Sequence, residues 1–172
     1  MKEYNSVSEP FLAELRAAVG EANVFTSPEK LEQYKTDEEY DPRRFRVPEA
    51  VVRPANAEEI AAVVKLCNKY NVPLTVRSGG TSLADGAIAV CGGIVLLMER
   101  LNKIIEMNTE AMYVIAEAGV RTIDIQKLAN EAGFLYAGDP CSAESCQIGG
   151  NLATNAGGSK ACLLYTSPSP RD

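Results

Sequence analysis

The sequence predicts an α+β fold with α/β character, in which a small parallel βαβ unit is followed by a mixed or antiparallel sheet with flanking helices. Two observations predict this class. Short apolar runs alternate with stretches whose apolar residues recur at helical spacing. In addition, nine of the 13 glycines fall in two windows, residues 77–93 and 149–158, which predicts two glycine-rich backbone loops between these elements.

The N-terminal part of the chain predicts two helices and a connection. Apolar residues recur at helical spacing over residues 8–20, where Ser8 can cap the first turn and Gly20 can end the helix. A second, short helix is expected to begin at residues 27–28, because proline is favoured at the first helical position. The charged residues 36–46 are then expected to form a surface connection.

The next segment predicts the βαβ unit. Residues 50–53 form one apolar run and residues 72–76 form another. Between them, Asn56 and Glu59 have the spacing of a capping box, and the apolar stripe that follows extends to Cys67. Because a crossover of this kind connects parallel strands, we expect the two runs to be parallel strands of one sheet.

The second half of the chain predicts strands and one more helix. Residues 94–98 read as an apolar strand, and residues 103–108 and 113–119 are expected to pair as a hairpin. Thr122 is expected to cap the following helix, after which residues 134–136 predict a short strand.

The composition excludes several classes of protein. The sequence has no histidine, which removes a Ser-His-Asp triad and a histidine-based zinc site. No stretch approaches the ~18 consecutive apolar residues of a membrane span, and the N-terminus has no apolar signal core, so we expect a cytoplasmic protein. The net charge is −6, and the basic residues Arg43, Arg44 and Arg46 stand beside acidic ones, which argues against a nucleic-acid surface. The five cysteines are expected to be reduced thiols, and Cys141 with Cys146 is too small a set for a metal site.

The first glycine-rich window has the chemistry of an anion site. Residues 77–86 directly follow a predicted strand of the parallel pair, which is where α/β proteins bind ligands. Glycine reaches positive φ at little cost, and successive main-chain N–H groups in such conformations form a concavity that binds anions. The window has neither the Walker A nor the Rossmann glycine pattern. From these residues alone, a phosphate loop and a tight structural turn both remain open.

Four segments carry a resemblance to a known family. They are residues 52–60 (VRPANAEEI), 76–87 (VRSGGTSLADGA), 139–142 (DPCS) and 146–158 (CQIGGNLATNAGG). In this order and spacing they resemble the cofactor-binding segments of the vanillyl-alcohol oxidase/PCMH family of FAD enzymes. The sequence is similar in particular to the glycolate oxidase GlcD subunit and to the D-lactate and D-2-hydroxyglutarate dehydrogenases. The resemblance extends from about residue 10 to residue 161.

The resemblance implies that FAD is held non-covalently by two groups of residues, one in residues 77–83 and one in residues 140–157. Relatives with covalently attached flavin place a histidine after the glycine pair, where this sequence has Thr81. For Arg77, an ion pair with Asp85 remains an open alternative to a phosphate contact. The residues implied to hold the FAD pyrophosphate are Arg77, Ser78, Gly79, Gly80, Thr81, Ser82 and Leu83. Those implied to line the path of the flavin, ribityl chain and phosphates are Pro140, Ser142, Cys146, Gly149, Gly150, Asn151, Thr154 and Gly157.

The resemblance also implies an activity. The full-length protein would be a flavin-dependent 2-hydroxy-acid dehydrogenase or oxidase of the glycolate or D-lactate type, in which a hydride passes from the substrate C2 to flavin N5. Electrons would continue to an electron-transfer flavoprotein, a quinone or an iron–sulfur subunit. Another PCMH flavoenzyme, such as an alkyl-dihydroxyacetone-phosphate synthase, and a non-catalytic FAD- or nucleotide-binding fragment remain alternatives.

The resemblance further implies that the chain is C-terminally truncated. The catalytic residues of the family follow the second glycine-rich segment, so we expect none in this chain and no activity from it alone. Residues 1–46 are expected to be an N-terminal helical segment, and residues 47–161 the N-terminal part of a PCMH-type FAD-binding domain. Residues 162–172 are expected to be a non-native tail, because their alternating Ser-Pro residues cannot continue a helix or a central strand.

Overall fold

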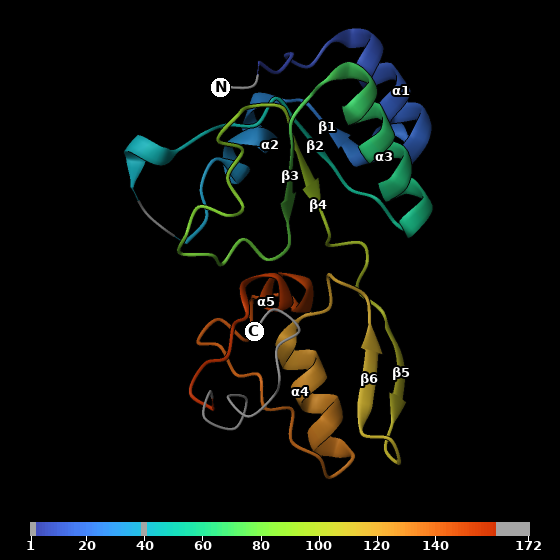
Figure 1. Ribbon diagram of the computed structural model, residues 1–172, viewed down its shortest axis with the longest axis vertical. Coiled ribbons are helices and arrows are strands. Elements are labelled where there is room, and N and C mark those ends of the chain that lie inside the picture. Colours follow the sequence, from blue (N-terminus) through green and yellow to red (C-terminus); the bar gives the residue numbers. More distant parts are fainter. Residues whose placement is uncertain (1–2, 39–40, 161–172) are drawn as a thin grey trace. The chain divides into compact units, whose positions relative to one another are not determined.

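The computed structural model describes residues 3–38 and 41–160, so the expected tail at residues 162–172 lies outside the described part. The chain divides into two compact units, residues 1–101 and residues 102–172. Helices and sheets are mixed in the chain, which confirms the predicted α+β class (Figure 1). Residues 1–46, expected as a separate helical segment, belong to the first unit together with residues 47–101.

The first unit is built on a four-stranded sheet with the order β1-β2-β4-β3. The strands are β1 (Val24–Phe25), β2 (Ala50–Val52), β3 (Leu74–Arg77) and β4 (Ile94–Leu97). Strands β2 and β3 both run parallel to β4, which lies between them, while β1 pairs antiparallel with β2. The predicted parallel βαβ unit is confirmed, but the insertion of β4 and the edge strand β1 were not predicted.

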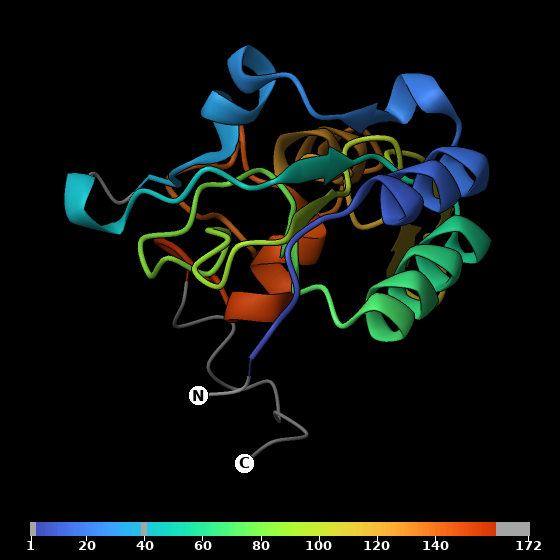
Figure 2. The same ribbon diagram turned by 90° about the horizontal axis from the view of Figure 1, so that it is seen from above.

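Helices cover both faces of this sheet. Helix α1 (Glu9–Val19) lies beside α3 (Ala57–Tyr70), as both views show (Figures 1 and 2), and the rings of Phe11 and Tyr70 meet edge to face at 5.4 Å. On the other face, Leu31 of α2 (Pro28–Leu31) packs in one cluster with Val51 and Val95. Burial on both faces explains why the central strands are continuously apolar. Short 3₁₀ turns at Glu21–Asn23, Glu32–Tyr34 and Pro42–Arg44 complete the unit.

The helix ends show which predicted caps form. Asn56 caps α3, because its side-chain oxygen accepts a hydrogen bond from the Glu59 N–H at 2.8 Å. The Glu59 carboxylate in turn accepts from the Ala55 N–H at 2.8 Å, one residue earlier than a capping box requires. Ser8 occupies the N-cap position of α1 as predicted, but its side chain makes no capping hydrogen bond.

The second unit consists of a hairpin and two helices. Strands β5 (Ile104–Asn108) and β6 (Tyr113–Ala116) pair antiparallel, which confirms the predicted hairpin. Helix α4 (Thr122–Glu131) and helix α5 (Ile148–Thr154) follow. A small core joins these elements through the buried residues Val120, Ile125 and Ile148.

Three predictions in this unit are wrong. Thr122 is the first residue of α4 and not its cap, because it is fully buried and its hydroxyl bonds to other side chains. Residues 134–136 form no strand, since their main chain has no strand partner among the described residues. The second glycine-rich window is not a loop throughout, because residues 148–154 are helical. Packing of Ile148 into the core supplies the contacts that outweigh the low helix propensity of two glycines.

Candidate functional site

The first glycine-rich window begins where β3 ends. Residues 78–86 leave the carboxyl end of this parallel strand and form turns without a helix. The residues from Ser78 to Ser82 are half-buried, yet among the described residues their main-chain N–H groups, with that of Leu83, donate no hydrogen bond. A half-buried amide without a partner is costly unless water or a ligand meets it. Residues 78–83, called the phosphate loop below, therefore offer a row of available donors.

Arg77 lies directly against the phosphate loop. A Cβ atom on Gly80, whose φ is +69°, would lie 2.2 Å from the Arg77 guanidinium, so only glycine permits this approach. The Arg77 guanidinium donates to the Thr36 carbonyl at 2.7 Å and stands over the Tyr34 ring. Burial lowers the pKa of Arg77 from its ordinary value, which still leaves the side chain positively charged at neutral pH. The loop amides and this cation together favour an anion.

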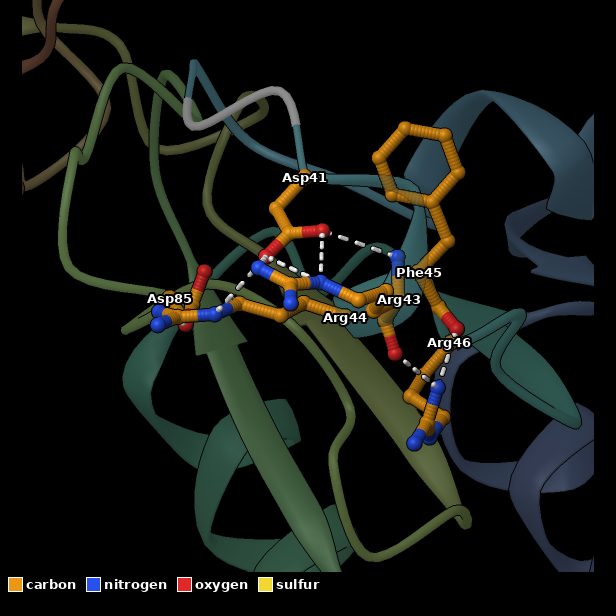
Figure 3. Close-up of polar contacts among 6 residues, drawn as sticks. All are labelled: Asp41, Arg43, Arg44, Phe45, Arg46 and Asp85. Carbon is orange, nitrogen blue, oxygen red and sulfur yellow. Dashed lines mark hydrogen bonds and ion pairs between the residues drawn. The ribbon is translucent and has the colours of Figure 1, made fainter.

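The alternative partner expected for Arg77 is occupied elsewhere. Asp85 forms its ion pair with Arg44, and Figure 3 shows Arg44 extended along Asp41 toward Asp85. The charge of Asp37 acts on Arg77 and opposes the lowering of its pKa by burial. The alternative of an Arg77–Asp85 ion pair is therefore not the arrangement in this structure.

The side chains of the phosphate loop differ in what they contact. The Ser82 hydroxyl accepts from the Ala84 N–H at 3.1 Å, which tightens the turn after the loop. The Leu83 side chain is 72% exposed, so it contributes little to the core of this unit. The hydroxyls of Ser78 and Thr81 make no hydrogen bond among the described residues.

The last glycines of the first window serve the fold. Gly92 and Gly93 form the turn before β4, where the Gly93 N–H donates to the Glu49 carboxylate at 2.8 Å. The same carboxylate accepts from the Val7 N–H at 2.8 Å. For this glycine pair, the structural turn is the correct interpretation.

The second predicted segment is hydrogen-bonded to the residues just before α4 and at its start. The N–H of Gly149 donates to the Ala118 carbonyl at 2.9 Å, and that of Ile148 donates to Val120 at 2.8 Å. In the opposite direction, the Thr122 N–H donates to the Cys146 carbonyl at 3.1 Å. The Gly149 N–H already has an acceptor, so it is not an available donor for a cofactor. The absence of a side chain at Gly149 can still allow a cofactor to approach the main chain closely.

A buried polar cluster joins α4 to α5. The Asn151 amide donates to the Thr122 hydroxyl at 2.5 Å, and this hydroxyl lies 3.2 Å from the Cys146 sulfur. All three residues are buried. Asn151 and Cys146 thus have protein partners for their side chains, and Thr122, which sequence reasoning missed as a site-supporting residue, connects them. No spacing pattern could have signalled this contact, since Thr122 is 24 residues from Cys146 and 29 from Asn151.

The remaining predicted residues of this segment hold its turns. The carbonyls of Pro140 and Ser142 accept hydrogen bonds from Ala143 and Cys146 at 2.9 and 2.7 Å. The Thr154 hydroxyl donates to the Gly150 carbonyl at 3.0 Å within α5. The Gly157 carbonyl accepts from the Asp139 N–H at 3.0 Å. The phosphate loop belongs to the first unit and this segment to the second, so their joint contact with one cofactor stays a prediction.

The second unit also contains an apolar hollow of about 550 Å³ between the hairpin and the two helices. Of the residues predicted to bind a cofactor, Gly149 alone lines it. Its other lining side chains include Met107, Tyr113, Phe134, Tyr136 and Leu152.

The described thiols of Cys67, Cys91, Cys141 and Cys146 are free. Within residues 3–38 and 41–160 no cluster of three potential metal ligands occurs, and no helix there has the length and apolar character needed to cross a membrane.

Comparison with protein families identifies the fold and its cofactor. A family model described as an FAD binding domain matches residues 48–166, which is more than half of the chain. The chain belongs to this family of FAD-binding domains. FAD is therefore its cofactor, and the phosphate loop suits the FAD pyrophosphate, because its amide donors are available and a guanidinium lies beside Gly80.

Curated relatives of this FAD-binding domain are oxidoreductases. The chain is 35% identical over 159 residues to D-lactate dehydrogenase of Anaerostipes hadrus, covering 92% of the chain and 33% of that protein. It is 36% identical over 152 residues to D-2-hydroxyglutarate dehydrogenase of Xanthomonas citri, covering 88% and 32%. With glycolate oxidase subunit GlcD of Bacillus subtilis it shares 35% over 117 residues, covering 68% and 25%. The chain thus spans about a third or less of the length of these relatives.

Solved structures share the fold of the FAD-binding domain. An alkyldihydroxyacetonephosphate synthase superposes with a TM-score of 0.78 at 22% identity, covering 91% of the chain and 33% of that protein. A 4-ethylphenol oxidase from Gulosibacter chungangensis superposes with a TM-score of 0.74 at 24% identity, covering 87% and 30%. At these identities the likeness establishes the fold alone. The predicted PCMH-type fold is confirmed.

Proposed function

We propose that the chain is the FAD-binding part of a flavin-dependent 2-hydroxy-acid dehydrogenase or oxidase of the glycolate or D-lactate type. The observation that carries this proposal is the row of available amides at residues 78–83 beside the Arg77 guanidinium, in a chain of the FAD-binding family. The names of the relatives at 35–36% identity supply the substrate class.

The role of the chain is to bind and orient FAD. When bound, FAD supplies the acceptor for the hydride from substrate C2 at flavin N5. Main-chain N–H groups of the phosphate loop hold the pyrophosphate, and the positive charge of Arg77 lowers the energy of that anion in a partly dehydrated site. Thr81 stands where covalent attachment would need a histidine, which favours non-covalent binding.

The partners of the full-length protein follow from the same proposal. The substrate would be a small 2-hydroxy acid, and the electron acceptor an electron-transfer flavoprotein, a quinone or an iron–sulfur subunit. We further propose a cytoplasmic location. The substrate-handling residues would lie in the part of the relatives that this chain does not cover, which is about two thirds of their length.

One experiment distinguishes the proposed function from two others. Likeness to an alkyldihydroxyacetonephosphate synthase extends to the fold only, and a non-catalytic FAD-binding module would need no further domain. Sequencing the gene beyond residue 161 and testing its full product with glycolate and D-lactate separates these cases. Flavin bleaching on addition of a 2-hydroxy acid supports the dehydrogenase, and its absence with both acids contradicts it.

Substituting Gly80 tests the phosphate loop itself. We expect Gly80→Val to abolish FAD binding, because a side chain at φ +69° would be strained and would displace the Arg77 guanidinium. The measurement is a titration of FAD fluorescence with the purified chain. Gly86→Val is the matched control, since a Cβ there lies 3.7 Å from its nearest neighbour and should leave FAD affinity nearly unchanged. Equal FAD affinity in Gly80→Val and wild type would show that the phosphate loop is misplaced.

A further inference from the structure

Three contacts join the phosphate loop and its flanks to a stretch that the sequence suggested was only a surface connection. This stretch, residues 36–38 and 41–46, is called the brace below. The Thr36 carbonyl accepts from Arg77 at 2.7 Å, and the Glu38 N–H donates to the Ser82 carbonyl at 3.1 Å. The third contact is the Arg44–Asp85 ion pair, which closes the turn that follows the loop (Figure 3). The contacts therefore lie before, within and after the phosphate loop.

The Asp85 side chain depends on this third contact. Asp85 has a φ of 57°, a left-handed conformation that aspartate adopts more readily than most residues other than glycine. Its side chain is 18% exposed, and its Oδ1 atom is buried with no hydrogen-bond partner among the described residues. A carboxylate in this setting needs a counter-charge, and Arg44 supplies it. The ion pair thus compensates the burial of this carboxylate.

We propose that the brace holds the phosphate loop in its anion-binding conformation and that Arg44 is a positioning residue acting through Asp85. The proposal rests on the proposed role of the loop in FAD binding. The loop amides make no hydrogen bonds of their own among the described residues, so contacts on the flanks must fix their geometry. A loop ordered in advance binds its ligand without the entropy cost of ordering. The brace precedes residues 48–166, the part that the family model matches.

The two ends of the ion pair predict unequal effects. Arg44→Gln leaves the Asp85 carboxylate largely buried without a counter-charge. In Asp85→Asn, the charge that loses its partner is that of Arg44. The Arg44 side chain is 54% exposed and still pairs with Asp41. Arg44→Gln should therefore disturb the loop more than Asp85→Asn, although both remove the same pair. Arg43→Gln is the matched control, because Arg43 is 88% exposed and pairs with Asp41, not with the loop.

Hydrogen exchange in the FAD-free chain tests the brace without relying on the cofactor. We expect Arg44→Gln to accelerate by about tenfold the exchange of three N–H groups that are hydrogen-bonded at the loop and its flanks, those of Glu38, Ala84 and Ile88, while Arg43→Gln leaves their exchange unchanged. Exchange in β2 and β4 serves as the internal reference, because a general loss of stability would accelerate it too. Unchanged exchange of these three N–H groups in Arg44→Gln would overturn the proposal. If Arg44→Gln does not fold, exchange is compared between Asp85→Asn, which removes the ion pair, and Arg44→Lys, which keeps the positive charge.

FAD affinity provides the second readout. Arg44→Gln should weaken FAD binding about tenfold, with Arg44→Lys intermediate, and should not change the affinity for riboflavin, which has no phosphate to meet the loop. Equal loss for FAD and riboflavin would contradict an action through the phosphate loop. If the wild-type chain binds no FAD, the proposed function fails, and the exchange measurement alone then decides whether the brace orders the loop.

Discussion

At the scale of single residues, the two glycine-rich segments differ in what their main-chain donors already bind. The amides of residues 78–83 have no hydrogen-bond acceptor in the described chain, whereas the Gly149 N–H is bonded to Ala118. A donor that is already satisfied must lose one hydrogen bond to form another, so its net contribution to anion binding is small. We therefore expect the first segment to be the stronger anion site of the two.

Cys67 illustrates how burial of one residue sets a pH dependence. Burial raises the pKa of Cys67 from 9.0 to about 11, so the folded state keeps a proton that the unfolded state releases at lower pH. The stabilisation is complete below the unfolded pKa and is lost as pH rises toward about 11. We expect a loss of about 2 kcal/mol over this window, measured by urea unfolding at several pH values.

The control for this prediction is Cys67→Ala, in which that part of the pH dependence should disappear. The absolute stability of Cys67→Ala will be lower, because the thiol packs in a buried position, so only the slopes are compared. Identical slopes in the two proteins between pH 9 and about 11 would contradict the assignment.

At the scale of elements, the first turn of α3 depends on one side chain. Asn56→Ala removes the hydrogen bond to the Glu59 N–H and should cost about 1 kcal/mol of unfolding free energy. Ser8→Ala is the matched control, because Ser8 occupies the same position of α1 without a capping hydrogen bond and should change stability little. Urea unfolding followed by circular dichroism measures both. A larger loss from Ser8→Ala than from Asn56→Ala would show that the caps are misassigned.

The contact between α4 and α5 depends on the Thr122 hydroxyl. Thr122→Val has nearly the same shape but leaves the buried Asn151 amide without its acceptor, which should cost about 1–3 kcal/mol. Thr122→Ser keeps the acceptor and should lose less. The measurement is again urea unfolding, combined with the rate at which a thiol reagent labels Cys146, which is buried in the wild type. Thr122→Val should increase this labelling rate and Thr122→Ser should not, and the reverse order would exclude the cluster as the link.

At the scale of the whole molecule, the second unit has an incompletely covered interior. Its hairpin is a separate two-stranded sheet, and an apolar hollow of about 550 Å³ lies against it. A two-stranded hairpin is marginally stable by itself. In relatives about three times as long, further chain is available to cover such a surface. This supports the proposal that the chain is part of a larger FAD-binding domain.

We therefore expect the 172-residue chain alone to retain FAD weakly and to be inactive on 2-hydroxy acids. The sequence has no histidine to act as general base, and the chain spans only about a third of the length of its relatives, so it would leave part of the cofactor uncovered. The tests are loss of flavin absorbance during gel filtration and turnover of D-lactate with an artificial electron acceptor. Tight co-purification of flavin, or turnover by the chain alone, would contradict this prediction, and the full-length gene product is the positive control.

The sequence by itself determined most of the local elements and the family. Caps such as Asn56, the apolar periodicity of α1 and α3, and the alternating runs of the hairpin are set by residues close in the chain, so their patterns can be read directly. The resemblance of four segments to the vanillyl-alcohol oxidase/PCMH family predicted the FAD-binding family, which the family match confirmed.

Only the tertiary structure decided which polar groups meet. The position of β4 between β2 and β3, the helical state of residues 148–154, and the Arg44–Asp85 ion pair all depend on contacts between distant parts of the chain. Such contacts leave no periodic signal, because their energy comes from burial and charge pairing after the chain has folded. For the same reason, sequence alone could not reveal that the amides of the phosphate loop are available while that of Gly149 is already bonded.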